Sequence, residues 1–187
     1  NGGAQRGHTV VTPFAEHTFK HFGSGTFFCA DTYFSSYFIC NPMEFYREYT
    51  ELSKVFDMCK IKVYRHPDCR WTTPWDMMAN QMLEIERGDK RHGSCGMGIW
   101  NTVSREGRVA SISIDEFERL PIEDQFAVLE NIRSSYFWVK KFKSYSLYKD
   151  AWESKETIRH FLSDIDFLFS RSKEMYPEYI FHEYEDI

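Results

Sequence analysis

The chain has 187 residues, a formal net charge of −5 and a high aromatic content of 17 Phe, 11 Tyr and 5 Trp. The negative charge excludes the basic footprint of a duplex nucleic-acid-binding domain, so we expect no nucleic-acid partner. No apolar run is long enough to span a bilayer and no secretory signal is visible, so we expect no membrane association. The length suits one domain with a sizeable core.

The cysteines are odd in number and show no Cys-x-x-Cys spacing, which indicates neither a disulfide framework nor a zinc site. Reduced thiols and a cytoplasmic location are therefore expected. The five are Cys29, Cys40, Cys59, Cys69 and Cys95.

The first third of the chain alternates strand and helix patterns. Residues 27–39 are rich in aromatic and β-branched side chains, which predicts a strand. Asn41 and Pro42 then predict a helix start, because asparagine caps and proline has the φ of the first helical position. Residues 61–64 form a second short strand candidate. The apolar face of the intervening helix is predicted from the helical spacing of Phe45, Tyr49, Leu52 and Phe56.

Helical patterns dominate the rest of the chain. Thr73-Pro74 repeats the cap-then-proline start, and Gly88 is the predicted stop of that helix. Residues 113–116 fit a capping box. Two further helices are predicted, one with an apolar face at Phe126, Leu129, Ile132 and Phe137, and one capped by Ser154 with a face at Ile158, Phe161, Leu162, Ile165 and Leu168.

This order of elements predicts the fold class. Strands mixed with helices come first and helices alone follow, which favours an α/β fold. We expect a mainly parallel sheet flanked by helices, with a helical excursion in the second half, and residues 1–187 are interpreted as a single domain.

Two glycine-rich runs, residues 1–10 and 91–100, each combine glycines with a histidine and a hydroxyl or thiol side chain. Consecutive N–H groups in such turns can form a nest for an anion. Neither run matches a standard phosphate-loop pattern, so two readings stay open: an anion site, or two ordinary surface turns. The anion-site reading predicts that the two runs converge on one cleft, with His8 and Ser94 facing a common pocket.

Five segments in order resemble motifs of the adenylosuccinate synthetases. Residues 1–10 resemble the family's Gly-Gly-Asn-Asn-Ala-Gly-His-Thr loop, and residues 21–25 resemble its His-Leu-Leu-Pro-Ser-Gly. Residues 37–42 are similar to a strand ending in Asp-Pro before a helix, and residues 73–76 to a Pro-Tyr-His helix start. Residues 92–99 resemble Ile-Gly-Thr-Thr-Gly-Arg-Gly-Ile-Gly-Pro. The resemblance covers residues 1–112, and 113–170 match in helical character.

Several departures from the family pattern affect the expected activity. Cys95 replaces a threonine that binds the nucleotide phosphate, and Met97 replaces an arginine. The family's Gly-Asp-Glu-Gly-Lys-Gly loop, with its catalytic Asp and phosphate-contacting Lys, is not among these residues, nor are its guanine-reading and aspartate-binding segments. The chain is therefore interpreted as the central part of a longer chain of this family, and the segment alone is expected to have no ligase activity.

The resemblance implies a GTP-dependent carbon–nitrogen ligase that joins IMP to aspartate with Mg²⁺, as a homodimer. The purine 6-oxygen attacks the γ-phosphate, and aspartate then displaces the resulting phosphate. His8 takes the catalytic role by donating to the phosphoryl charge, and the carbonyl oxygen of Gly7 binds Mg²⁺. Without the resemblance, His8 reads as an ordinary polar turn residue.

The resemblance also implies the nucleotide-binding residues. Gln5, Ser94 and Cys95 contact the IMP phosphate, and Arg105 or Arg108 reaches the IMP site of a neighbouring subunit. The backbone of both glycine runs supplies a phosphate loop that comprises Gly7, Thr9, Gly93 and Gly96.

Two alternatives remain beside this function. One is an enzyme of the same chemistry that uses a related purine nucleotide. The other is a catalytically inactive nucleotide-binding or scaffolding relative that keeps the fold.

Overall fold

A computed structural model describes residues 3–106 and 112–176. The strands are β1 (His8–Val11), β2 (Glu16–Phe19), β3 (Thr32–Phe34), β4 (Ile39–Cys40), β5 (Val63–Arg65), β6 (Arg70–Trp71) and β7 (Ser172–Glu174). The α-helices are α1 (Pro42–Leu52), α2 (Pro74–Arg87), α3 (Ile99–Glu106), α4 (Ile114–Arg119), α5 (Ile122–Ser135), α6 (Tyr145–Glu153) and α7 (Lys155–Arg171). Short 3₁₀ turns are η1 (Ser24–Phe28), η2 (Met58–Lys60), η3 (Gly88–Lys90) and η4 (Phe137–Lys141).

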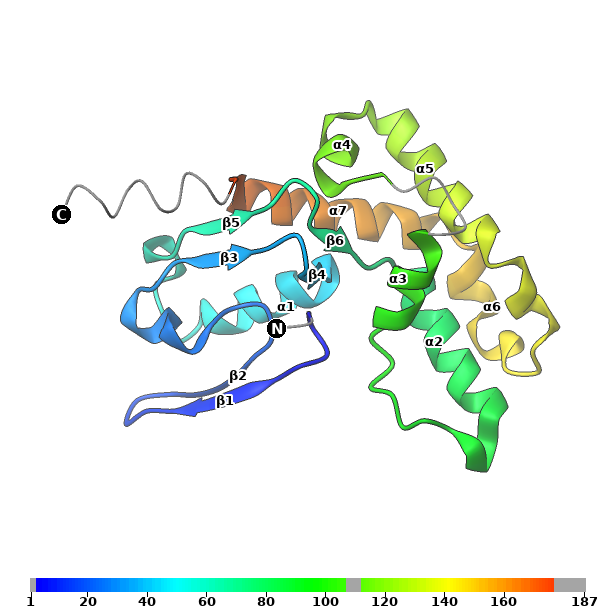
Figure 1. The fold of residues 1–187 in the computed structure, drawn as a ribbon, viewed down its shortest axis with the longest axis horizontal. Helices are drawn as coiled ribbons and strands as arrows, with labels where there is room; N and C mark the ends of the chain where they lie inside the picture. The colour runs from blue at the N-terminus through cyan, green and yellow to red at the C-terminus, as the bar shows by residue number, and fades with distance from the viewer. Residues whose placement is uncertain (1–2, 107–111, 177–187) are drawn as a thin grey trace.

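The described part of the chain is an α/β fold with parallel strands, as the sequence predicts. Strand β5 lies between β3 and β7 and pairs with both in parallel, with Tyr64 opposite Tyr33 and Lys173. A second parallel pair joins β4 to β6, and β1 forms an antiparallel hairpin with β2. Figure 1 shows the strands and α1 in one half, helices α2, α3, α5 and α6 in the other, and α7 extending across both. Within the described residues, no helix has the length and apolar character needed to cross a membrane.

The predicted helix starts are confirmed, because each is made by side chains close in sequence. The side chain of Asn41 accepts a hydrogen bond from the N–H of Glu44 at the start of α1. Thr73 and Asp76 form a capping box at the start of α2, and Gly88 ends that helix with a φ of 53°. The predicted caps at Ser113 and Ser154 likewise begin α4 and α7, and the predicted apolar face of α7 is buried throughout.

The predicted strand over residues 27–39 is wrong in most of its length. Its first residues belong to the 3₁₀ turn η1, which ends at Cys29 with a left-handed φ of 61°. Residues 35–38 form another turn, closed by a hydrogen bond from the N–H of Phe38 to the carbonyl of Ser35. Phe34 is buried from β3 and Phe27 and Phe38 are buried from turns, whereas Phe28 and Tyr37 are exposed. Aromatic density in this segment therefore specifies neither extended backbone nor burial of every ring.

Three other boundaries differ from the sequence expectation. The helix predicted to carry Phe56 on its apolar face ends at Leu52. The strand predicted over residues 61–64 runs over Val63–Arg65. The long helix predicted to include Phe137 ends at Ser135, and Phe137 lies in η4 with its side chain 69% exposed. Phe137 therefore does not belong to the buried face that its spacing suggested.

The core is dominated by aromatic rings. The ring centroids of Phe34 on β3 and Phe38 lie 4.6 Å apart in a stacked pair, and those of Trp71 on β6 and Phe117 on α4 lie 4.7 Å apart. The indole N–H of Trp75 donates to a backbone carbonyl of α6, which ties α2 to the helical half. All five cysteines are free thiols.

Candidate functional site

The glycine turn at residues 3–7 and the amino ends of α1 and α2 lie close together. A side chain at Gly3 would come within 2.4 Å of the carbonyl oxygen of Ile39, so this turn is pressed against β4. The side-chain amide of Asn41, directly after β4, donates to the sulfur of Met77 in the first turn of α2. The carboxyl ends of β4 and β6 therefore lead into neighbouring helix starts, which is where ligands bind in open parallel sheets.

The segment between α2 and α3 is fixed to α2 by its last glycine. Gly98 has a φ of 72°, and a Cβ there would lie 2.6 Å from the backbone carbon of Asp76. The N–H of Gly98 donates to the side chain of Asn80, whose amide group in turn donates to the hydroxyl of Ser94. The loop backbone thus lies directly against the first two turns of α2.

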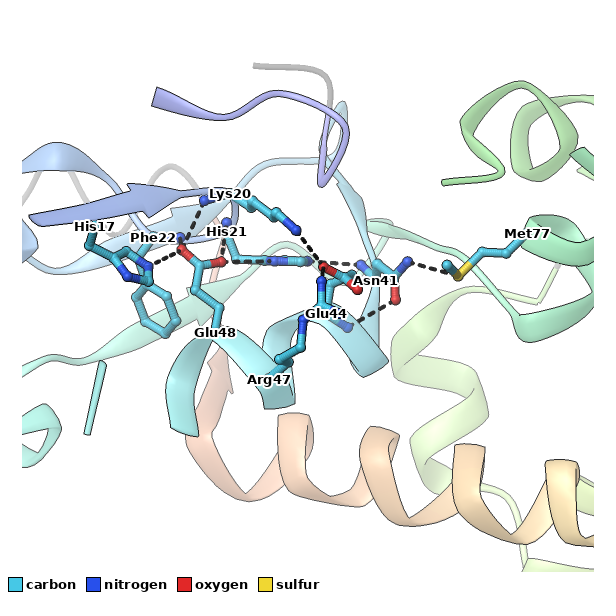
Figure 2. Close-up of polar contacts among 9 residues, drawn as sticks. All are labelled: His17, Lys20, His21, Phe22, Asn41, Glu44, Arg47, Glu48 and Met77. Atoms are coloured by element: carbon cyan, nitrogen blue, oxygen red, sulfur yellow. Dashed lines mark hydrogen bonds and ion pairs between the residues drawn. The ribbon is translucent and has the colours of Figure 1, made fainter. Parts of the chain in front are cut away.

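A buried polar cluster joins the hairpin to α1 (Figure 2). Glu48 on α1 accepts hydrogen bonds from the backbone N–H groups of Lys20 and His21 at 2.8 and 2.7 Å, and its carboxylate lies 3.2 Å from Nδ1 of His21. The other ring nitrogen of His21 accepts the backbone N–H of Asn41 at 3.0 Å. Nδ1 therefore carries the proton, and His21 bridges the end of β2 to the cap of α1.

The charges of this cluster are balanced on the α1 surface. Burial alone would raise the pKa of the Glu48 carboxyl, but the hydrogen bonds from His21 and from the backbone outweigh burial and lower the pKa below its ordinary value of 4.5. Glu44, one turn earlier, pairs with Lys20 and with Arg47, each at 2.6 Å. The cluster therefore fixes the position of β2, the strand that pairs with the strand of His8.

Sequence reasoning missed Glu48 and assigned no function to His21. His21 was visible inside one of the family-like motifs, at residues 21–25. Glu48 also follows Glu44 by one helical turn, which places two carboxylates on one side of α1. These two signals together point to a polar cluster between the hairpin and α1.

His8 begins β1, so the glycine turn is shorter than the sequence indicated. Its exposed ring stacks on the buried ring of Phe19, with centroids 5.6 Å apart, because the two residues face each other in the hairpin. Thr9 bonds through its hydroxyl to the hydroxyl of Thr18. Gln5 and Gly7 are exposed on the turn before β1.

The turn at residues 91–98 already holds an anionic group of the chain itself. The N–H groups of Gly93 and Ser94 both donate to one carboxylate oxygen of Glu84 on α2, at 2.8 and 3.3 Å. The side chain of Gln81 donates to the carbonyl of Gly96, and Cys95 is exposed beside it. The backbone here binds a carboxylate oxygen in the way expected of an anion nest.

The two predicted halves of the site lie on separate projections. Figure 1 shows the β1–β2 hairpin beside the sheet, whereas the segment 91–98 runs back from the carboxyl end of α2 to the start of α3. The ring of His8 rests on Phe19, whereas the hydroxyl of Ser94 is held by Asn80. Their convergence on one pocket stays a prediction.

Of the two arginines that the resemblance offers for a neighbouring subunit's IMP site, the structure describes only Arg105. Arg105 is 7% exposed, and its guanidinium donates to the carboxylate of Asp76 at 3.1 Å and to the carbonyl of Trp71 at 2.8 Å. Tyr136 donates to the same carboxylate oxygen at 2.5 Å. Arg105 thus binds inside the chain in this structure, and Arg108 lies outside the described residues.

The residues of the two glycine turns offer groups that suit Mg²⁺ and a nucleotide phosphate. Among residues 3–106 and 112–176, no three His, Cys, Asp or Glu side chains are grouped to hold a metal ion. Gly7 is an exposed residue, and a backbone carbonyl oxygen suits Mg²⁺, which keeps most of its ligands as water and phosphate oxygens. The pair of N–H groups at Gly93 and Ser94 suits a phosphate oxygen, because it already holds a carboxylate oxygen.

Comparison with known proteins gives one family. The chain matches the sequence profile of adenylosuccinate synthetase over residues 1–181. A fully ligated adenylosuccinate synthetase from Plasmodium falciparum has a similar fold, with a TM-score of 0.60 and 14% sequence identity. The similarity covers 89% of this chain and 37% of that chain, so this chain spans well under half of that protein. No curated protein matches the chain.

Proposed function

Because the chain belongs to the adenylosuccinate synthetase family, we propose that it forms the central domain of a GTP-dependent ligase for purine nucleotides. The reaction is the condensation of IMP, or a related purine nucleotide, with aspartate through a 6-phosphoryl intermediate. One structural observation supports this proposal independently of family membership. The backbone turn that resembles the family's phosphate loop binds an anionic oxygen through two adjacent N–H groups.

His8 is the proposed catalytic residue. Negative charge on the transferring phosphoryl oxygens is greatest in the transition state, so a donor placed there contributes most at that point. The ring of His8 is supported by Phe19, and the hairpin that carries both is attached to α1 through Glu48. Glu48 is therefore a positioning residue in this proposal. Mg²⁺ supplies charge neutralisation for the phosphate oxygens, and the carbonyl of Gly7 is its proposed protein ligand.

The nucleotide phosphate is assigned to the polar groups of both glycine turns. Gln5, Ser94 and Cys95 are the proposed side-chain contacts, with the backbone of the second turn supplying N–H donors. Because Arg105 is paired inside the chain with Asp76, Arg108 is the better candidate to reach a neighbouring subunit in a homodimer.

The test uses the complete protein with IMP, GTP, aspartate and Mg²⁺, and it measures adenylosuccinate formation by absorbance. Product that requires all three substrates supports the proposal. The His8→Ala variant is expected to lower kcat by about 10²–10³ with little change in the KM for either nucleotide, since its interaction strengthens in the transition state. The matched control is His160→Ala, because His160 is exposed on α7.

The outcomes separate the two functions left open by the sequence. Tight nucleotide binding without product would favour a catalytically inactive nucleotide-binding or scaffolding relative. Equal turnover of wild type and His8→Ala would remove His8 from the mechanism.

A further inference from the structure

The anion-binding turn at residues 91–98 is already filled by a side chain. One carboxylate oxygen of Glu84 accepts the N–H groups of Gly93 and Ser94 at 2.8 and 3.3 Å. The other oxygen accepts a hydrogen bond from the guanidinium of Arg87 at 2.5 Å. Two backbone donors and one cation around a single carboxylate are the same donors that a phosphate group would use.

Glu84 lies on the helix that also holds the turn through other side chains. Its side chain is 13% exposed and projects from α2, the helix that also holds the turn through Asn80 and Gln81. Partial burial alone would raise the pKa of Glu84, but the hydrogen bonds from Arg87, Ser94 and Gly93 outweigh burial and lower the pKa. The carboxylate is therefore ionised at neutral pH and remains a full anion beside the turn.

We infer that Glu84 is a tethered competitor of the substrate phosphate: its carboxylate closes the turn, and a phosphate group binds Gly93 and Ser94 only after displacing it. The inference rests on the proposed function, since it concerns the phosphate site of that reaction. The displaced carboxylate would leave Arg87 free to pair with the phosphate in its place. Phosphate binding is thereby coupled to a rearrangement between α2 and the turn.

The size of the effect follows from the population of the open turn. Apparent affinity falls by the fraction of molecules in the binding-competent state. If the closed form outweighs the open form by ten to one, removing the carboxylate strengthens phosphate binding about tenfold. The expected direction is unusual, because removal of a side chain from a binding site ordinarily weakens binding.

The test measures the amide chemical shifts of Gly93 and Ser94 in the ¹⁵N-labelled protein during titration with inorganic phosphate at constant ionic strength. Wild type is compared with Glu84→Ala, which removes the acceptor, and with Glu84→Gln, whose uncharged amide oxygen can still accept both N–H groups. The control is Asp89→Asn, which removes a charge of the same sign on the adjoining segment η3. Amide hydrogen exchange at Gly93 and Ser94 gives a second readout.

The inference predicts half-saturation at about tenfold lower phosphate in Glu84→Ala than in wild type or Asp89→Asn, and a smaller gain in Glu84→Gln. Both amides should also exchange faster in Glu84→Ala without phosphate. Equal affinity in wild type and the Glu84 variants would overturn it, as would amides that no phosphate concentration perturbs. An equal gain in Asp89→Asn would also overturn it, because the cause would be general charge. Ligase activity is measured separately, so failure of the proposed reaction is distinguishable from failure of this inference.

Discussion

The buried carboxylate of Asp76 offers the sharpest test of what holds the helical half together. Its side chain is fully buried and accepts hydrogen bonds from the backbone and hydroxyl of Thr73, from Arg105 at 3.1 Å and from Tyr136 at 2.5 Å. In Asp76→Ala the guanidinium of Arg105 would lose its buried partner. Leaving such a charge unpaired costs about 3–5 kcal/mol. This is a large share of the roughly 5–15 kcal/mol that stabilises a typical domain.

The matched control is Glu116→Ala. Glu116 occupies the same capping-box position at the start of α4, with Ser113 as its partner, but it is exposed. Glu116→Ala leaves the Ser113 cap in place, so it should cost no more than the roughly 0.5–2 kcal/mol of a lost N-cap. Urea unfolding followed by tryptophan fluorescence gives both free energies of unfolding. If the free energy of unfolding falls no further in Asp76→Ala than in Glu116→Ala, the buried Asp76–Arg105 ion pair does not hold the helical half together.

Three further perturbations follow from the described contacts. Gly98→Ala should lower the thermal stability of the protein more than Gly93→Ala does. Both glycines have a positive φ, which costs an alanine about 1–2 kcal/mol, but of the two only Gly98 also lacks room for a Cβ. Because folding lowers the pKa of Glu48, the ionised carboxylate should stabilise the folded protein fully above pH 4.5, and this stabilisation should be lost as pH falls further. A difference in unfolding free energy between wild type and Glu48→Gln that stays constant down to pH 3 would contradict this. Burial raises the pKa of Cys69 to about 12 and that of Cys40 well above its ordinary value, so neither should react with a thiol reagent before unfolding. The exposed cysteines that should react in the folded protein are Cys29, Cys59 and Cys95.

The parts of the fold that could be predicted from the sequence are those made by neighbouring residues. Asn41 caps α1 through the N–H of Glu44, and Thr73 caps α2 through Asp76, so each signal and its partner lie within four positions. Strand positions depend on distant partners instead. The strand β7 follows α7 directly and pairs with β5, about a hundred residues earlier, and its sequence of Ser, Lys and Glu has no strand pattern.

For the candidate site, the sequence indicated which backbone turns to consider but not which side chains bind to them. The glycine pattern left two readings of residues 91–98 open, an anion nest or an ordinary surface turn, and the structure places a carboxylate oxygen on the N–H groups of this turn. No pattern indicated that the anion is Glu84, because a glutamate late in a helix reads as an exposed charge. Arg105 is the converse case. Its burial depends on Asp76, which lies 29 positions earlier on another helix.

The central claim is that this chain serves a ligase in which the purine 6-oxygen is phosphorylated and then leaves as phosphate. The most direct measurement uses IMP labelled with ¹⁸O at the 6-oxygen, with GTP, aspartate, Mg²⁺ and the complete protein, and follows the released phosphate by ³¹P NMR. The proposed reaction predicts that the label appears in inorganic phosphate, one ¹⁸O for each adenylosuccinate formed. Unlabelled phosphate accompanying product formation would contradict it, and so would phosphate release without adenylosuccinate.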